Sequence, residues 1–415
     1  MSDKKYDIIV IGGGAAGFFA ALNALELNPW LRVLLLEKSN KLLAKVKISG
    51  GGRCNVTHAC FEPDELIKNY PRGGRQLRTA FHEFNTNDTI RWFAAKGVDL
   101  KKEPDGRMFP VTDNSQTIID CFMQEAQRLN LEIKLGVNVS SIEQSEEEWQ
   151  VHVEGGGHFM ANKIVIAVGG SPKPEGLQWL KQMGHKISNP VPSLFTFNVP
   201  NHPITEMMGL SVSNATVKIE GTKFSYSGPL LITHWGFSGP AVLKLSSFAA
   251  TELAALNYKF NILVNWCGNS NQEAVKEQFI ALMIKEGNRK LFNCTFNHFP
   301  SRLWKYLLTK AEVHEETKAF DLGDKKINKI VQILTNDSYT VSGKTTFKEE
   351  FVTAGGIHLD SVNMKTMESK VCHGLYFVGE VLDVDGITGG FNFQAAWSTG
   401  YLAAKSIVKS LNPEN

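Results

Sequence analysis

The sequence is poor in cysteine, with 6 residues among 415, and no two of them form a Cys-x-x-Cys pair. A disulfide-stapled domain needs a dense, even set of cysteines, and a structural zinc site needs closely paired ligands. We therefore expect neither a disulfide framework nor a bound metal. Sparse, unpaired cysteine is also typical of proteins from a reducing compartment.

An excess of either charge is also missing. Lys and Arg total 44 against 42 for Asp and Glu, which leaves a net charge of +2. No overall field draws such a chain to nucleic acid or to an anionic membrane. Hydrophobic residues at 43% and charged residues at 21% are ordinary for a globular enzyme and exclude a disordered, collagen-like or coiled-coil chain. The length favours about 2 to 3 domains.

No hydrophobic run is a clear membrane span. Residues 8–25 come closest, because they are almost entirely apolar and follow Lys4 and Lys5. This stretch holds several glycines and Asn23, lacks a small-residue cleavage site, and is followed at once by Glu26. A strand, a turn and a helix explain it better than a signal or membrane segment does. We therefore expect a cytoplasmic protein.

The start of the chain has the pattern of one βαβ unit. Residues 7–11 and 32–36 are apolar, β-branched runs typical of strands that are buried on both faces. Between them, the alanine-containing stretch 15–27 predicts a helix that ends before Pro29.

The turn of this unit, Gly-Gly-Gly-Ala-Ala-Gly at 12–17, matches the dinucleotide fingerprint G-x-G-x-x-G. Gly12 allows the tight turn, Gly14 lets a pyrophosphate approach the backbone, and Gly17 allows close helix–strand packing. The helix that follows offers free N–H groups and a partial positive charge to the phosphates. Glu37, at the end of the next strand, is placed to bind a ribose diol and disfavours the 2′-phosphate of NADP. A glycine turn without a ligand is the plain alternative.

Two features near the C-terminus favour FAD over NAD. A predicted buried strand ends on Gly379 and Glu380, and Asp383 follows. Acids at a strand end can bind the hydroxyl groups of a long cofactor. The alternative is an acid at an exposed strand end that binds no ligand, because the sequence pattern would be the same. The turn at 390–392 then opens a predicted helix over 391–409, whose N-terminus could face one edge of a flavin.

Other strings carry weaker indications. Three glycines in the predicted loop 45–57 give a backbone that can lie against a flat ring or a phosphate, and Arg53 there can pair with an anion. Cys54 has no partner cysteine at a working spacing, so we interpret it as packed and inert. Gly169, after the predicted strand 163–168, can let a loop cross the dinucleotide.

His234 lies in a string that mixes a histidine with aromatic residues and glycines. One interpretation makes it a proton donor in a substrate wall. The other, which we prefer, is a packed hairpin with a hydrogen-bonded histidine. In a separate string at 70–78, three arginines, Arg72, Arg75 and Arg78, could bind a ligand, but most such clusters are solvated faces.

The chain changes character at about residue 190, where prolines crowd a short stretch. Strand-like alternation follows, and after it three amphipathic patterns predict helices at 272–286, 301–310 and 325–334. We predict an FAD-binding domain in two parts, 1–190 and 341–415. Between them lies an insertion made of a β-barrel-like part, 191–268, and a helical part, 269–340.

With both ends in view, the sequence resembles the BaiN-like family of NAD(P)/FAD-dependent oxidoreductases, close to the aminoacetone-oxidase-like flavoproteins. The resemblance runs nearly end to end. It rests on IIVIGGGAAG (8–17), LLLEK (34–38), KISGGGRCNVT (47–57), IAVGG (166–170), ITHWGFSGPAVLKLS (232–246), TAGGI (353–357) and GEVLDVDGITGGFNFQAAWSTG (379–400).

This resemblance implies an α/β fold of the glutathione-reductase-like class, in which an FAD-binding Rossmann domain carries an inserted β-barrel plus helical subdomain. It also implies tightly held FAD. By motif position, the FAD contacts would be Gly12, Gly14, Ala16, Gly17, Glu37, Lys38, Arg53, Gly169, Gly379, Glu380, Asp383, Gly390, Phe391 and Asn392. Family members look like reductases of activated double bonds in steroid-like molecules or like oxidases of small amines.

The leading hypothesis is an FAD-dependent oxidoreductase that transfers hydride through flavin N5. NAD(P)H would be a transient electron donor, and a small, unsaturated organic or steroid-like substrate would bind between the FAD domain and the insertion. An oxygen-dependent oxidase of a small amine is one alternative. A flavin-binding accessory protein in RNA modification is another, against which the near-neutral charge argues. The chain holds one fingerprint and no redox cysteine pair, so we do not expect a disulfide reductase. The oligomeric state stays open.

Overall fold

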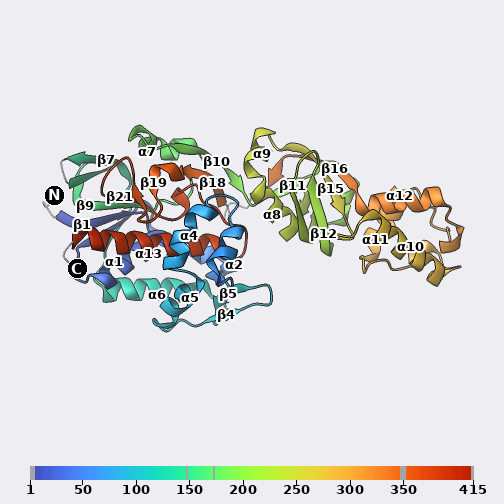
Figure 1. Ribbon diagram of the computed structural model, residues 1–415, viewed down its shortest axis with the longest axis horizontal. Coiled ribbons are helices and arrows are strands. Elements are labelled where there is room, and N and C mark those ends of the chain that lie inside the picture. Colours follow the sequence, from blue (N-terminus) through green and yellow to red (C-terminus); the bar gives the residue numbers. More distant parts are fainter. Residues whose placement is uncertain (1–4, 146–147, 172, 346–351, 413–415) are drawn as a thin grey trace. The chain divides into compact units, whose positions relative to one another are not determined.

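The computed structural model describes residues 5–145, 148–171, 173–345 and 352–412. The chain forms two compact units (Figure 1). The first joins Met1–Ser193 to Lys348–Asn415, and the second is the inserted segment Leu194–Phe347. One continuous hydrophobic core extends through the second unit from Phe195 to Val341. The further division of the insertion at residue 269 stays a prediction.

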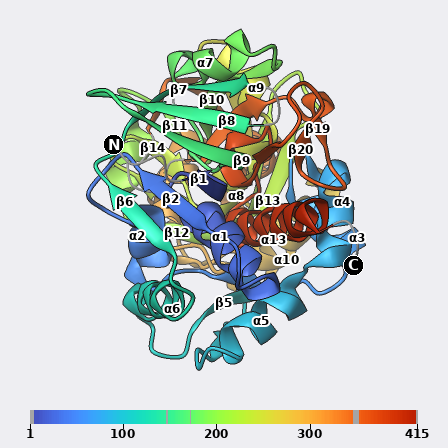
Figure 2. The ribbon, with the colours of Figure 1, turned by 90° about the vertical axis from the view of Figure 1, so that its left-hand side faces the viewer.

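A nine-stranded sheet forms the centre of the first unit (Figure 2). Its parallel part has the order β21-β9-β1-β2-β6, and Val10 of β1 lies between Leu35 of β2 and Val165 of β9. Runs that are apolar throughout suit these positions, because a parallel sheet is covered on both faces. The strands of this sheet are β1 (Lys5–Ile11), β2 (Val33–Glu37), β6 (Glu132–Leu135), β7 (Val139–Ser145), β8 (Glu148–Val153), β9 (His158–Ile166), β19 (Val362–Asn363), β20 (Glu368–Ser369) and β21 (Leu375–Phe377).

Two smaller sheets complete the strands of this unit. They are formed by β3 (Thr57–His58), β5 (Arg107–Pro110) and β4 (Leu100–Lys102), and by β10 (Ile187–Ser193) with β18 (Val352–Ile357). The helices are α1 (Ala15–Leu27), α2 (Ala44–Gly52), α3 (Pro63–Leu66), α4 (Gly74–Glu83), α5 (Thr86–Ala94), α6 (Ser115–Arg128), α7 (Gln178–Gln182) and α13 (Phe391–Leu411).

The helices α1 and α13 run side by side, as both Figure 1 and Figure 2 show. Gly400 makes this approach possible, because a Cβ atom there would lie only 3.0 Å from the carbonyl oxygen of Ala16. The first turns of α1 therefore pack against the middle of α13, and each helix begins after a glycine, Gly14 or Gly390.

The prediction of a loop over 45–57 is wrong for its first half, where α2 lies. The helix is interrupted rather than regular. Ser49 is extended (ψ 149°), and Gly50 and Gly51 are left-handed, with φ of 59° and 68°. The glycines break the helix near its end instead of preventing it, since glycine adopts positive φ at little cost.

The second unit contains a seven-stranded sheet in the order β16-β15-β12-β13-β14-β11-β17. Its strands are β11 (Thr196–Asn198), β12 (Ser211–Ile219), β13 (Ser225–Thr233), β14 (Gly236–Ser238), β15 (Lys259–Asn265), β16 (Asp337–Ser342) and β17 (Lys344–Thr345). Its helices are α8 (Pro240–Phe248), α9 (Ala250–Ala255), α10 (Gln272–Glu286), α11 (Ser301–Lys310) and α12 (Asp324–Thr335). Within the described ranges, no helix has both the length and the apolar character that crossing a bilayer requires.

His185 in the first unit predicts a pH dependence of stability. His185 is only 2% exposed. Its Nε2 atom lies 2.8 Å from the Ser369 hydroxyl, and its Nδ1 atom lies 3.1 Å from the Leu180 carbonyl oxygen. Burial lowers the pKa of His185. The unfolded chain therefore binds this proton more readily, and the folded state loses stability as the pH falls below about 6.5.

We expect His185→Gln, which cannot be protonated, to lose less unfolding free energy than the wild type when the pH is lowered from about 7.5 to 5.5. Urea unfolding at both pH values measures this difference. Equal losses in the two proteins would show that His185 does not contribute to the pH dependence.

Candidate functional site

The glycine turn between β1 and α1 is closed on one side and open on the other. A Cβ atom at Gly12 (φ 117°) would lie 2.3 Å from the Ala167 carbonyl oxygen, and one at Gly17 would lie 2.0 Å from the Gly12 carbonyl oxygen. Gly14 is different, because no atom lies within 4 Å of the position that its Cβ would take. The first turn of α1 has no side-chain cap and no acidic residue. Its N–H groups are therefore left for an external anion.

The carboxylate of Glu37 is fixed beside this turn. Its Oε2 accepts a hydrogen bond from the Gly13 N–H at 2.8 Å, and its Oε1 accepts one from the Ser39 N–H at 2.8 Å. Each oxygen has a further lone pair, so the oriented carboxylate can still accept from two hydroxyl groups. Lys38 is exposed next to it.

A second acidic group lies where β9, β18 and the segment after β21 meet. Glu380 accepts hydrogen bonds from the Thr353 N–H at 3.0 Å and from the Lys45 ammonium at 2.5 Å. A Cβ atom at Gly170 would lie 2.9 Å from the Glu380 carboxyl carbon and 2.9 Å from the Thr353 Cβ. Its neighbour Gly169 (φ 74°) faces open space.

The hydroxyl group of Thr353 tests whether a ligand fits here. It is buried and has no hydrogen-bond partner among the residues that the structure describes. Buried hydroxyl groups are almost always bonded, so one without a partner in the protein has room to bond to a water or to a ligand. Together with the open space beside Gly14 and Gly169, this fits a bound dinucleotide.

The turn before α13 is held in place by close packing against the backbone and by hydrogen bonds from two asparagine side chains. Gly390 (φ 93°) has no room for a side chain, because its Cβ would lie 2.5 Å from the Thr57 carbonyl oxygen. The Asn55 amide oxygen accepts from the Gly390 N–H at 3.0 Å. The Asn392 side chain bonds to both the N–H and the carbonyl oxygen of Gly386, at 2.8 and 3.0 Å. The turn is therefore rigid before any ligand arrives.

Aromatic and amide side chains pack beneath the same turn. Phe391 is buried and stacks on His58, with ring centroids 4.6 Å apart, and His58 Nδ1 lies 2.9 Å from the Gly389 carbonyl oxygen. Gln394, also buried, accepts hydrogen bonds from the hydroxyl groups of Thr57 and Thr89 at 2.6 and 2.9 Å. Because the Phe391 and Asn392 side chains are used internally, this turn can offer a ligand chiefly its backbone N–H groups.

A family model matches residues 6–406 of the chain, and it is described as the HI0933-like protein Rossmann domain. The chain belongs to this family. It is an FAD-dependent oxidoreductase, and both the expected resemblance and the expected fold class are confirmed.

Two relatives of this HI0933-like protein align over nearly its whole length. A 3-dehydro-bile acid delta(4,6)-reductase of Clostridium scindens is 27% identical over 408 residues, which are 96% of this chain and 98% of the relative. A ribosomal RNA dihydrouridine synthase of Escherichia coli is 28% identical over 416 residues, with 98% of each chain covered.

Solved structures with the same fold include a 3-ketosteroid delta1-dehydrogenase of Sterolibacterium denitrificans. It has a TM-score of 0.53 and 12% identity, and the match covers 98% of this chain and 100% of that one. The open form of a flavocytochrome c3 fumarate reductase has a TM-score of 0.51 and 14% identity, covering 98% and 78%. At such identities the likeness shows the fold alone.

Two further predicted contacts lie in the first unit of the HI0933-like chain. Gly379 (φ 72°) packs against α1, because its Cβ would lie 2.7 Å from the Ala16 Cβ. The Asp383 carboxylate accepts a hydrogen bond from the Gly355 N–H at 3.1 Å. Both residues therefore have structural partners, and their contact with FAD stays a prediction.

Arg53 is bound within the chain. Its guanidinium lies 2.6 Å from the Glu103 carboxylate and 3.4 Å from that of Asp113, and it sits over the Phe109 ring at 4.0 Å. These acids raise the pKa of Arg53, mainly through the hydrogen bond to Glu103. An anionic ligand would therefore have to compete with two carboxylates. Next to it, Cys54 is packed inside the protein, and burial raises the pKa of its thiol to about 12.

His234 lies in the second unit, where its ring is exposed and meets the Trp235 ring edge-on, with centroids 4.1 Å apart. The arginine cluster is used inside the first unit, since Arg72 pairs with Asp385 and Arg78 pairs with Asp64. Neither Lys45 nor Thr353, which both contact Glu380, was predicted from the sequence. Thr353 begins the string TAGGI, which carried the family resemblance but no residue role, and nothing in the sequence distinguishes Lys45 from its neighbours.

Proposed function

We propose that this protein is an FAD-dependent reductase of a carbon–carbon double bond that is conjugated to a carbonyl group, with NADH or NADPH as the electron donor. The pair of nearly full-length relatives carries this proposal. One is named for reducing the 4,6 double bonds of a 3-oxo bile acid. The other is named for making dihydrouridine, and the double bond of uridine is conjugated to a ring carbonyl. A bile acid and a uridine in RNA are very different molecules, but in both the reacting group is a carbon–carbon double bond conjugated to a carbonyl group.

We assign the cofactor to the cradle in the first unit. When bound, FAD takes up hydride and passes it on to a substrate. We infer that the turn and the first residues of α1 hold the pyrophosphate, while the acid that ends β2 holds the ribose. The full set that we assign to FAD is Gly12, Gly14, Ala16, Gly17, Glu37, Lys38, Arg53, Gly169, Gly379, Glu380, Asp383, Gly390, Phe391 and Asn392.

The residues of the chain would act on the cofactor in three ways. The oriented Glu37 carboxylate fixes one end of it, and the Thr353 hydroxyl gains a hydrogen-bond partner. The rigid turn at Gly390 presents the N-terminus of α13, which favours negative charge beside it. A proton must also reach the substrate, and His234 stays our proposed donor because its ring is exposed to an incoming molecule.

The test is an anaerobic reduction series on purified, FAD-loaded protein. We expect NADH or NADPH to bleach the flavin absorbance, and a 3-oxo steroid with a conjugated double bond, or uridine in ribosomal RNA, to restore it with formation of the saturated product. The acceptor that restores the flavin absorbance, steroid or RNA, identifies the substrate class. A flavin that neither nucleotide bleaches, but that small amines reduce and air reoxidises with release of peroxide, would overturn the proposal in favour of an amine oxidase.

A further inference from the structure

The strand β6 forms one edge of the nine-stranded sheet. It pairs with β2 on one side, from Leu34 opposite Glu132 to Glu37 opposite Leu135. No strand in the described parts of the chain pairs with its other side. An open edge is a template for another strand, and proteins blunt such edges with a proline, a bulge, a short strand or charged side chains such as lysine. β6 is short and carries Lys134, so an added strand must supply a partner for that charge. The segment 131–135 contains no proline.

The sequence of this edge is complementary to itself when it is read in reverse. Residues 131–135 are Leu-Glu-Ile-Lys-Leu. If two copies pair antiparallel about Ile133, then Glu132 lies opposite Lys134 of the other copy, and Leu131 lies opposite Leu135. Directly opposed residues share a face of a sheet, so every row joins opposite charges or apolar groups. An in-register parallel pairing would instead oppose like charges.

The two faces of the edge match this pairing. On one face, the Glu132 carboxylate accepts a hydrogen bond from the Tyr6 hydroxyl at 2.9 Å, and the Lys134 ammonium sits over the Phe159 ring. Both side chains stay partly exposed, at 33% and 41%. The charges are therefore held at the edge and can still be reached from outside.

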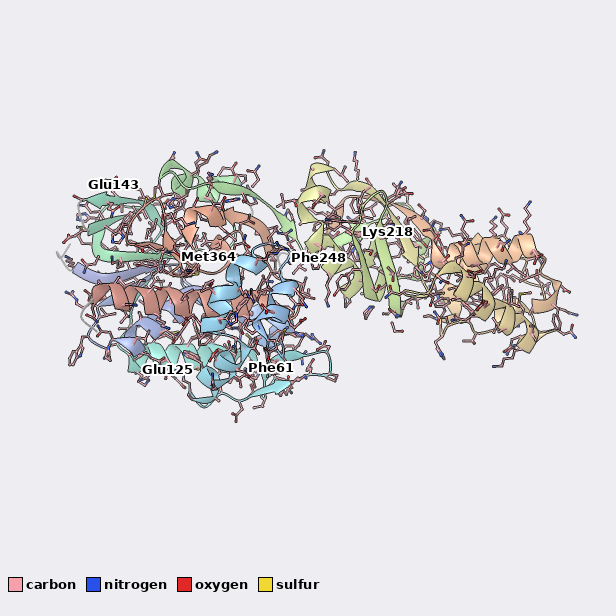
Figure 3. The ribbon with its side chains drawn as sticks, viewed as in Figure 1. Phe61, Glu125, Glu143, Lys218, Phe248 and Met364 are labelled. Carbon is pink, nitrogen blue, oxygen red and sulfur yellow. The ribbon has the colours of Figure 1, made fainter. Side chains whose placement is uncertain are left out.

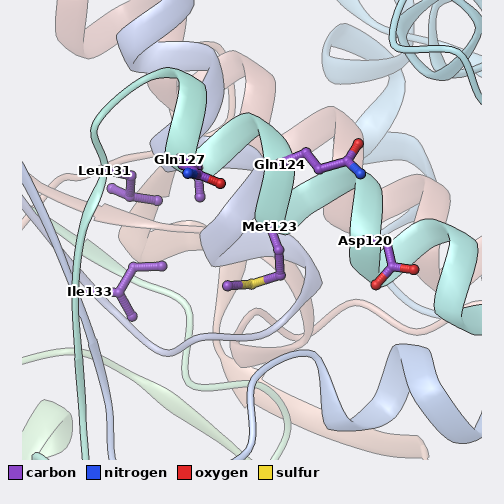
Figure 4. Close-up of a pocket in the computed structure, with 7 residues that line it drawn as sticks. Asp120, Met123, Gln124, Gln127, Leu131 and Ile133 are labelled. Carbon is purple, nitrogen blue, oxygen red and sulfur yellow. The ribbon is translucent and has the colours of Figure 1, made fainter.

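On the other face, an open hollow of about 500 Å³ lies between α6 and the edge (Figure 4). Leu131 and Ile133 border it from the strand side, and Met123 borders it from α6 together with the polar side chains of Asp120, Gln124 and Gln127. Met123 is 38% exposed and Leu135 is 44% exposed. The hollow is of mixed polarity and lies beside the open edge, so an added strand there could cover its apolar part, formed by Met123, Leu131 and Ile133.

We propose that β6 is the dimer interface of this protein, and that its occupant is β6 of a second copy of the same chain. The two strands pair antiparallel about a twofold axis through Ile133, which joins two nine-stranded sheets into one. Such an interface is isologous, because each copy offers the same surface to the other. The axis places both α6 helices on the same face of the joined sheet, where their Met123 side chains close over the hollow.

Charge reversal tests this arrangement. In Lys134→Glu, two opposed Glu–Lys rows become Glu–Glu rows, and in Glu132→Lys they become Lys–Lys rows. We expect each single variant to weaken dimerisation by at least about tenfold, which is about 1.4 kcal/mol. The double variant restores the opposite pairing and should recover the dimer. Sedimentation of FAD-loaded protein over a concentration series distinguishes the 46.0 kDa chain from its dimer.

The matched control is Lys218→Glu, because Lys218 is also an exposed strand lysine but lies on β12, between β13 and β15 (Figure 3). It should leave the mass unchanged. Flavin content and circular dichroism show whether each variant is folded. A wild type that stays monomeric at every concentration overturns the proposal. A dimer that both single variants leave intact overturns it too, as does a double variant that fails to recover.

Discussion

Replacing Gly14 by valine is expected to give folded protein that binds FAD at least about 100-fold more weakly, a loss of about 2.7 kcal/mol. The backbone at Gly14 (φ −93°, ψ −171°) is open to any L-residue, and no atom lies within 4 Å of the added Cβ. The valine side chain therefore causes no clash in the protein. It fills the space in front of the first turn of α1, where a pyrophosphate would meet the helix N–H groups.

The chain offers a matched control in Gly323. It precedes α12 in the same way, with an extended backbone (φ −80°, ψ 161°), no side-chain cap and open space around its Cβ position. Gly323→Val should leave FAD binding unchanged. Titration of apoprotein with FAD gives the affinities, and urea unfolding shows whether either variant is destabilised. Equal affinity in Gly14→Val and the wild type would refute the fingerprint interpretation of this turn.

Local pattern predicted the regular elements well. The helices at 15–27, 272–286 and 301–310 have the expected bounds, and the helix expected at 391–409 is α13, which ends at Leu411. In each case the spacing of apolar residues and the flanking Pro or Gly reflect forces that act within a few residues. The interrupted helix α2 was missed, because its three glycines predict a loop when they are read without their neighbours.

The parts of the candidate site that the sequence could not predict are long-range contacts. Lys45 and Glu380 are 335 positions apart, and Thr57 and Gln394 are 337 positions apart. No periodicity links such pairs, because the fold alone brings them together. The fingerprint glycines could be predicted since their reason is local, a tight turn and a close helix. The Thr353 hydroxyl needed the structure, because only burial shows that it lacks a partner.

The partner of Arg72 could not be predicted from the sequence either, because Asp385 lies 313 positions away. This buried ion pair gives a prediction of stability. We expect Asp385→Ala to lower the unfolding free energy by about 3–5 kcal/mol. Asp385 is fully buried, where both of its carboxylate oxygens accept from the Arg72 guanidinium and one also accepts from the Ser193 hydroxyl at 2.8 Å. Burial raises the pKa of Asp385, and the hydrogen bonds from Arg72 oppose that shift. Removing the carboxylate leaves a guanidinium that is only 16% exposed without this counter-charge.

A second ion pair from the same run of arginines, between Arg78 and Asp64, serves as the control for this prediction. Arg78 and Asp64 also form an ion pair, but their side chains are 56% and 61% exposed. Water solvates both groups when the pair is broken, so Asp64→Ala should cost no more than about 1 kcal/mol. Urea unfolding of the two alanine variants at neutral pH measures both losses. If they are equal, burial does not decide the energetics of this cluster. If Asp385→Ala is the larger, the two ion pairs from one run of arginines differ because the Arg72 guanidinium, unlike that of Arg78, is too buried for water to solvate it when its carboxylate is removed.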